Sequence, residues 1–283
     1  MKRKLFTGGI AVMLCLAMSG NAQQKATSYT EKENMAVKTR LNFNNRADFE
    51  DAHRGFIATL EDEAIKNENG SVSYPLNAWK FLEGEAPATA NPSLWRQSQL
   101  NAIHGLFEVV PGAIYQVRGF DLANMTFVRT DHGWIIIDAT TSEASALAGY
   151  RLVKQHLGDL PVRALIITHP HIDHYGGMEA ICREVSNKDM KIIVPKGFYE
   201  EALSENVMAG TAMGRRASYM YGLLLPRHAG GNIGTGLGTT NSRGKSMLMR
   251  PTDEIGTTGE RREIDGLEME FMFVPEAEAP VEM

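Results

Sequence analysis

The side chains best suited to chemistry lie in residues 168–177, which read THPHIDHYGG. Three histidines and one aspartate fall within six positions there, at His169, His171, Asp173 and His174. Neutral imidazoles together with a carboxylate suit a borderline-soft divalent cation, above all zinc. Histidines also gather in ordinary solvated loops, but four ligand-type side chains in the order His-x-His-x-Asp-His make that alternative improbable. We therefore interpret the segment as a dinuclear metal site.

The elements around this segment follow an α/β pattern. Residues 162–167 (VRALII) form an apolar run of strand length directly before it, and residues 174–185 have helical character with an early Gly-Gly. A strand that ends in clustered ligands just before a helix is where α/β folds place active sites. A further strand is predicted over 190–194, and a buried one over 133–138 (GWIIID), which ends in Asp138.

The rest of the pattern predicts further elements of the same fold. Thr140 followed by Glu143 is a capping-box signature, and the helix it opens is predicted to run to about His156. Alternating helices and strands favour helices packed against sheets. The remaining predictions are strands over 112–118, 123–130 and 263–274, a hairpin-like turn at 131–133, and a glycine-rich flexible loop over 230–244.

The start of the chain has the composition of a targeting segment. Basic residues at 2–4, an apolar stretch over 5–18 and small residues at 19–22 predict a signal peptide over residues 1–22. Export into the periplasm or the medium is therefore expected. The apolar stretch is short for a membrane span, and the sequence holds no second run of spanning length, so no stable membrane anchor is expected.

Composition divides the remaining chain and excludes one class of function. Residues 23–100 are polar and irregular, with helix-like pieces around 47–67, and are interpreted as an N-terminal arm or subdomain; residues 101–283 form the main domain. The formal net charge of -5 gives no support to nucleic-acid binding. Without the signal segment Cys182 is the only thiol, so no intramolecular disulfide can form, and we expect it to pack as a small buried hydrophobe.

The metal segment resembles the signature of the metallo-β-lactamase superfamily. Asp138 matches the aspartate that precedes the metal loop in that superfamily, where it supports the ligands from behind. The resemblance implies an α/β fold, the αβ/βα sandwich of two sheets with helices outside and the metals at one edge. For this chain we expect a sandwich incomplete at the C-terminus, preceded by the N-terminal arm.

Within the superfamily the chain is most similar to the linear alkyl sulfatases, which hydrolyse detergents such as dodecyl sulfate. Together the blocks that carry this resemblance are much more specific than the metal motif alone. They are residues 91–97 (NPSLWRQ), 116–126 (QVRGFDLANMT), 216–222 (RASYMYG) and 278–283 (EAPVEM).

The resemblance implies two zinc ions per site, one held with the help of His169 and His171, the other with Asp173 and His174. The glutamate of the family's Thr-Glu-Ala-Pro block is a further ligand and falls on Glu278, although Ala277 replaces the threonine. Without this match, Glu278 would be interpreted as a surface carboxylate in an acidic tail.

Further roles follow from the same resemblance. Asp173 is the expected catalytic residue, positioning the nucleophilic water in addition to holding metal. Tyr219 and Tyr221 are candidates to line the substrate pocket, although aromatic side chains near a core more often simply pack.

The function implied is zinc-dependent hydrolysis of linear primary alkyl sulfate esters to alcohol and sulfate by a metal-activated water. Members of the family are longer, with another ligand glutamate, a ligand histidine, a helical dimerisation domain and a lipid-carrier-like domain, and they form homodimers. We therefore expect a C-terminally truncated product whose zinc site is incomplete. Two alternatives stay open: hydrolysis of a lactam or thioester by the same fold, and a zinc-binding fragment without catalysis.

Overall fold

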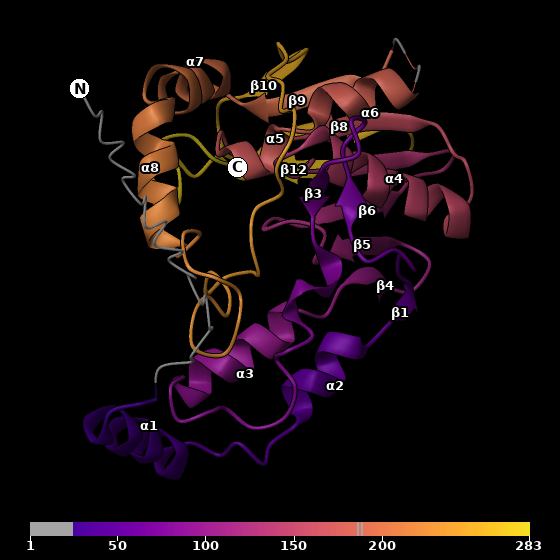
Figure 1. Cartoon of the computed structure of the whole chain (residues 1–283). Helices are drawn as coiled ribbons and strands as arrows, with labels where there is room; N and C mark the ends of the chain where they lie inside the picture. Colours follow the sequence, from indigo (N-terminus) through magenta and orange to yellow (C-terminus); the bar gives the residue numbers. More distant parts are fainter. Residues whose placement is uncertain (1–24, 186, 188) are drawn as a thin grey trace, which may run out of the picture.

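The computed structural model describes residues 25–185, 187 and 189–283, and its centre is one twisted sheet (Figure 1). The predicted signal peptide lies outside these residues. Within the described part the sheet has eight strands, and it is antiparallel from β1 to β7 and parallel from β7 to β10. In spatial order they are β1 (Phe56–Ala58), β4 (Gly105–Val110), β5 (Ile114–Arg118), β6 (Met125–Arg129), β7 (Trp134–Ile137), β8 (Val162–Ile166), β9 (Lys191–Pro195) and β10 (Asp253–Ile255).

The parallel strands β7, β8 and β9 are largely buried on both faces, which is why they read as mostly apolar runs. Leu165 of β8 points into the core that α4 (Glu143–Leu157) and α6 (Met178–Val185) cover. Its neighbour Ile166 points to the opposite face, where it packs with Ile264 and Phe271 of a two-stranded unit. This layering confirms the predicted α/β class. Cys182 packs against the α4–α6 core, although it is only partly buried rather than fully buried as expected.

That two-stranded unit corrects the prediction of a single strand over 263–274. The chain instead forms the hairpin β11 (Glu260–Ile264) and β12 (Leu267–Phe271). Asp265 and Gly266 make the turn with φ of 49° and 82°, the left-handed backbone that an Asp-Gly pair adopts readily. The alternating pattern was real, but the Asp-Gly signal inside it reverses the chain.

Two further predictions need correction. The helix after β7 is capped by Ser142, whose Oγ accepts from the Ser145 N–H, and not by Thr140, whose φ of 56° lies outside the extended region that an N-cap residue adopts. In the N-terminal region, only α2 (Ala47–His53) of the predicted helical pieces is helical. The chain after it is extended and contributes β1 to the central sheet and β2 (Ile65–Lys66) to a small hairpin.

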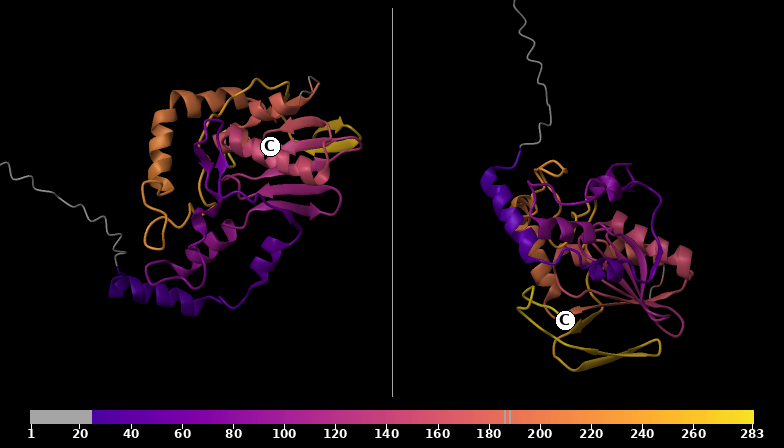
Figure 2. Two further views of the ribbon diagram at one scale, coloured as in Figure 1. Left: turned by 45° about the vertical axis from the view of Figure 1, so that its right-hand side comes forward. Right: turned by 90° about the horizontal axis from the view of Figure 1, so that it is seen from below.

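The N-terminal elements gather at one end of the molecule (Figures 1 and 2). They are the helices α1 (Ser28–Arg40), α2 and α3 (Pro92–Asn101). The strand β3 (Val72–Tyr74), which pairs with β2 and precedes the 3-10 helix η1 (Leu76–Trp79), lies instead beside α4. The boundary drawn from the sequence near residue 100 stays a prediction. No helix among the described residues is long and apolar enough to cross a membrane.

A second helical arm follows β9 and runs down one side of the molecule (Figure 1). It consists of α7 (Phe198–Leu203), the π-helical turn η2 (Ser204–Met208) and α8 (Gly210–Met220). Residues 230–244 contain no helix or strand, so the predicted loop is confirmed, whereas its flexibility stays a prediction.

A buried carboxylate ties this loop to the sheet. Asp121 accepts hydrogen bonds from the backbone N–H of Leu122, Thr141 and Ser242 and from the hydroxyls of Thr141 and Ser242. Complete burial raises the pKa of the Asp121 carboxyl, although these donors oppose the shift. The carboxylate thus joins three segments that are far apart in the sequence.

Replacement of this carboxylate should be costly. We expect Asp121→Ala to lower the free energy of unfolding by roughly 3 kcal/mol, because buried N–H donors would lose their acceptor. Urea denaturation measures the change, with Asp62→Ala, at an exposed carboxylate, as the control. A loss below about 1 kcal/mol would contradict the role assigned to Asp121.

Candidate metal centre

The predicted metal segment lies at the carboxyl ends of the parallel strands β7 and β8. Thr168 and His169 follow β8, and His171 caps the short helix α5 (Ile172–Tyr175) with an extended φ of -67° and ψ of 140°. The Gly-Gly pair after α5 is required by close packing. A Cβ on Gly176 would collide with the carbonyl oxygen of Thr141, and one on Gly177 with that of Ala139.

Three predicted ligands converge, although Glu278 is distant in sequence. Glu278 Oε1 lies 3.8 Å from His169 Nε2 and 3.7 Å from His171 Nδ1, and all three ligand atoms lie within 4.8 Å of one another. The segment that carries Glu278 continues to Met283, whose N–H donates to the Thr168 carbonyl at 3.1 Å. This hydrogen bond holds the segment against the metal loop. The structure therefore places Glu278 beside the two histidines, and its role as a ligand stays a prediction.

This cluster fits a divalent metal. His169 is only 3% exposed, and its buried Nε2 has no hydrogen-bond partner. Such a nitrogen is costly to bury unless something satisfies it. In a tetrahedral zinc site, ligand atoms about 2.0–2.2 Å from the ion lie roughly 3.3–3.6 Å apart, and the distances from Glu278 to the two histidines, 3.8 and 3.7 Å, are close to this value. Two imidazoles and a carboxylate also make up a known catalytic zinc donor set with one position open.

The other two predicted ligands lie beside this cluster. His174 Nε2 is 3.6 Å from Asp173 Oδ2, and the ring centroids of His169 and His174 are 3.9 Å apart. Among the described residues, these two supply a pair of ligand atoms rather than a group of three. The structure thus gathers all five predicted ligands at one end of the sheet, as a cluster of three and an adjoining pair.

Asp138 is hydrogen-bonded to this loop, and its role as a support of the metal ligands stays a prediction. Its Oδ1 accepts from the N–H of Thr168 at 2.9 Å, and its Oδ2 accepts from Nδ1 of His174 at 2.8 Å. Burial lowers the pKa of His174, but the hydrogen bond and charge of Asp138 outweigh it and raise that pKa to about 8. Burial and the neighbouring His174 lower the pKa of His169, which favours a neutral, ligand-type imidazole.

The two tyrosine candidates differ. The side chain of Tyr219 is 76% exposed. Tyr221 is half-buried, and its pKa is raised by burial and then by the negative charge of Asp173, with Arg216 opposing. Tyr221 is therefore close enough to the metal loop to feel the charge of Asp173, whereas Tyr219 projects into solvent.

Sequence reasoning missed one carboxylate at the site. Glu205 of the π-helical turn places Oε2 3.7 Å from Nε2 of His171. No ligand-type spacing marks it, because it comes from a separate helical arm.

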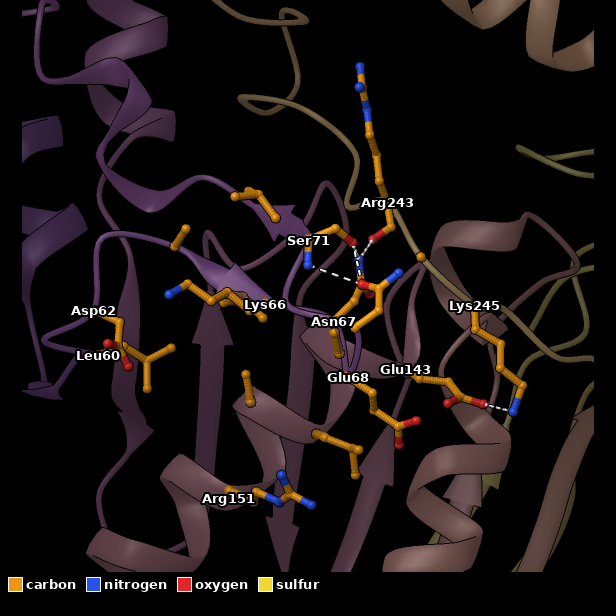
Figure 3. A pocket seen from close by; sticks show the side chains of 18 of the residues that line it. Leu60, Asp62, Lys66, Asn67, Glu68, Ser71, Glu143, Arg151, Arg243 and Lys245 are labelled. Atoms are coloured by element: carbon orange, nitrogen blue, oxygen red, sulfur yellow. Dashed lines mark hydrogen bonds and ion pairs between the residues drawn. The ribbon is translucent and has the colours of Figure 1, made fainter.

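A large cavity of about 1020 Å³ lies elsewhere, between α4 and the β2–β3 hairpin (Figure 3). It is lined by Leu60, Lys66 and Arg151, among others, and the Glu143–Lys245 ion pair closes one side. None of the predicted metal ligands lines it, so it is distinct from the metal centre.

Comparisons with known proteins agree with this geometry. Residues 118–233 match the metallo-beta-lactamase superfamily. A linear primary-alkylsulfatase of Pseudomonas sp is 52% identical over 91% of this chain and 39% of its own length. The alkyl/aryl-sulfatase BDS1 of Saccharomyces cerevisiae is 44% identical over 90% of this chain and 40% of its own length. The chain thus spans about two fifths of the length of the curated relatives it matches.

A solved structure is similar over the same region. The stereoselective inverting sec-alkylsulfatase Pisa1 from Pseudomonas sp. matches with a TM-score of 0.86 and 41% identity, over 92% of this chain and 41% of that one. The fold expected from the sequence is therefore confirmed, and it implies a metal at the site. Residues 118–233 thus match the metallo-β-lactamase superfamily, and the chain is similar to alkylsulfatases over most of its length.

Proposed function

We propose that this chain forms the metal-binding part of a zinc-dependent hydrolase that cleaves alkyl sulfate esters to an alcohol and sulfate. The observation that carries the proposal is the buried, unpartnered Nε2 of His169, which faces the same point as His171 Nδ1 and the Glu278 carboxylate. The sulfatase names of the similar proteins support the choice of ester.

Linear primary esters such as dodecyl sulfate are the proposed substrates. The linear primary-alkylsulfatase is 52% identical to this chain, whereas an (R)-specific secondary-alkylsulfatase, also from Pseudomonas sp, is 41% identical. The half-buried phenol of Tyr221 is proposed to line the approach of the substrate. Tyr219, at 76% exposure, would reach substrate only at the outer rim.

We assign metal binding and water positioning to different residues of this chain. His169, His171 and Glu278 would hold one zinc ion, and Asp173 and His174 would contribute to a second. When bound, zinc supplies positive charge that lowers the pKa of water and stabilises negative charge on the sulfate group. Asp173 would orient the attacking water, since a carboxylate beside the ligands can accept its proton.

Supporting contacts fix the orientation of the ligands. The Nδ1–H of His174 is held by Asp138, so its Nε2 lone pair is free to bind metal. The Nδ1 of His169 contacts the hydroxyl of Thr168 at 3.0 Å, and this likewise leaves Nε2 free. Sulfate esters are poor electrophiles, so such fixed positioning and charge stabilisation must carry much of the rate enhancement.

Removal of one ligand should abolish the reaction. We expect the parent chain to release sulfate from dodecyl sulfate in the presence of zinc, and His171→Ala to lower the rate at least about 100-fold. Sulfate release and zinc content are measured together, with His156→Ala, at an exposed histidine of α4, as the matched control. Equal sulfate release by His171→Ala would overturn the assignment.

The same assay separates the alternatives. Turnover of nitrocefin or a glutathione thioester without sulfate release would favour another hydrolase of this fold. Zinc bound at His171 without turnover of any ester would favour a non-catalytic metal-binding protein.

The contact of Asp138 with His174 gives a second prediction. Asp138→Asn should raise the dissociation constant for zinc by roughly 10–100-fold, because the amide lacks the charge that orients the imidazole. Competition with a chromophoric chelator measures the change. Asp159→Asn, at an exposed carboxylate remote from the loop, serves as the control, and unchanged affinity in Asp138→Asn would count against the supporting role.

A further inference from the structure

Each histidine ligand has one nitrogen directed toward the proposed metal and one directed away from it. The outward nitrogen of His169 meets Thr168, and that of His174 meets Asp138. A neutral imidazole carries one N–H and one lone pair, so the outward contact decides which nitrogen can bind metal. The outward nitrogen of His171 is Nε2, because Nδ1 lies on the side of Glu278.

Glu205 is the group that faces this nitrogen. Its Oε2 lies 3.7 Å from His171 Nε2, and both side chains are partly buried, at 24% and 29% exposure. Among the described residues, no lysine or arginine lies within 4.0 Å of the Glu205 carboxylate, and His171 is its one ionic partner. A partly buried carboxylate without a cationic partner gains most from a donor such as an imidazole N–H.

Two features of the surrounding structure hold Glu205 in this place. It lies in the π-helical turn between α7 and α8, and such turns insert an extra residue that redirects side chains, frequently at functional sites. The next residue, Asn206, donates from Nδ2 to the Pro170 carbonyl at 3.4 Å and to that of Ala202 at 3.3 Å. The turn is thus tied to the residue directly before His171.

We propose that Glu205 is a positioning residue for the metal centre: its carboxylate accepts the Nε2–H of His171 and so fixes the tautomer in which Nδ1 binds the metal. The separation of 3.7 Å is too long for a hydrogen bond. The pair would close to a hydrogen bond when a metal holds His171 as a neutral ligand, just as catalytic hydrogen bonds that are long in apo structures tighten when the site is occupied. The inference rests on the proposed function only in requiring that His171 binds metal.

The test compares metal binding rather than turnover. Glu205→Ala should raise the dissociation constant for zinc by roughly 10–100-fold, and Glu205→Gln, whose amide oxygen can still accept the N–H, by less. Affinity is measured by chelator competition, and the ligand geometry by the visible absorption of the cobalt-substituted chain. Glu200→Ala, at an exposed glutamate of α7, should match the parent in both.

A double-mutant cycle separates positioning from a general structural effect. In the His171→Ala background, Glu205→Ala should cause no further loss of affinity, since the imidazole it orients is gone. An equal loss in both backgrounds, or parent-like affinity and cobalt absorption in Glu205→Ala, would overturn the proposal. If Glu205→Ala does not fold, the graded loss in Glu205→Gln and its absence in the His171→Ala background decide the question.

The outcomes also distinguish this inference from the proposed function. A parent chain that binds no zinc, or whose affinity does not depend on His171, contradicts the proposed metal site itself. Normal binding in the parent, loss in His171→Ala and no change in Glu205→Ala contradict only the role of Glu205.

Discussion

The carboxylate of Asp138 is the point on which the geometry of the metal loop depends. Asp138 lies where β7 ends, and its backbone is left-handed with a φ of 63°. The backbone N–H of Asp138 donates to the Ile166 carbonyl of β8 at 2.8 Å. Its side chain then accepts from Thr168 and His174. Where the paired strands β7 and β8 end, the side chain of Asp138 therefore continues to link the two chain segments. One carboxylate fixes the departure of the loop from the sheet and the orientation of a ligand histidine.

A second constraint brings the proposed ligand Glu278, which is distant in sequence, to this loop. The β11–β12 hairpin packs Ile264 and Phe271 against the face of the sheet opposite the helices. Its turn is held by Asp265, which accepts from the hydroxyl of Thr130 at 2.6 Å and from the His132 N–H at 2.9 Å. The chain leaves this anchored hairpin with only a short distance to cover before Glu278. Apolar packing on one face of the sheet therefore sets the position of a polar group at its edge.

Features that depend on local sequence patterns could be predicted, whereas features that depend on long-range contacts could not. The strands β7 and β8 and the metal loop could be predicted because their residues are neighbours in sequence and their periodicity is strong. The helix cap at Ser142 was missed because tertiary contacts determine the backbone conformation of Thr140. The capping-box pattern contains no information about such contacts. Glu278 could be placed only through family resemblance. Glu205 had no local signal, since its role depends on how a helical arm docks on a loop.

The arrangement of the three histidines gives a physical reason for their spacing. His169 and His174 both direct Nε2 inward, because their Nδ1 atoms meet Thr168 and Asp138 beneath the loop. His171, at the start of α5, has Nδ1 on the side of Glu278, so Nδ1 is directed inward and Nε2 outward. A support for this outward nitrogen cannot come from the strand ends that hold the other two. It must come from an element packed over the loop, and the π-helical turn between α7 and α8 is the element that reaches it.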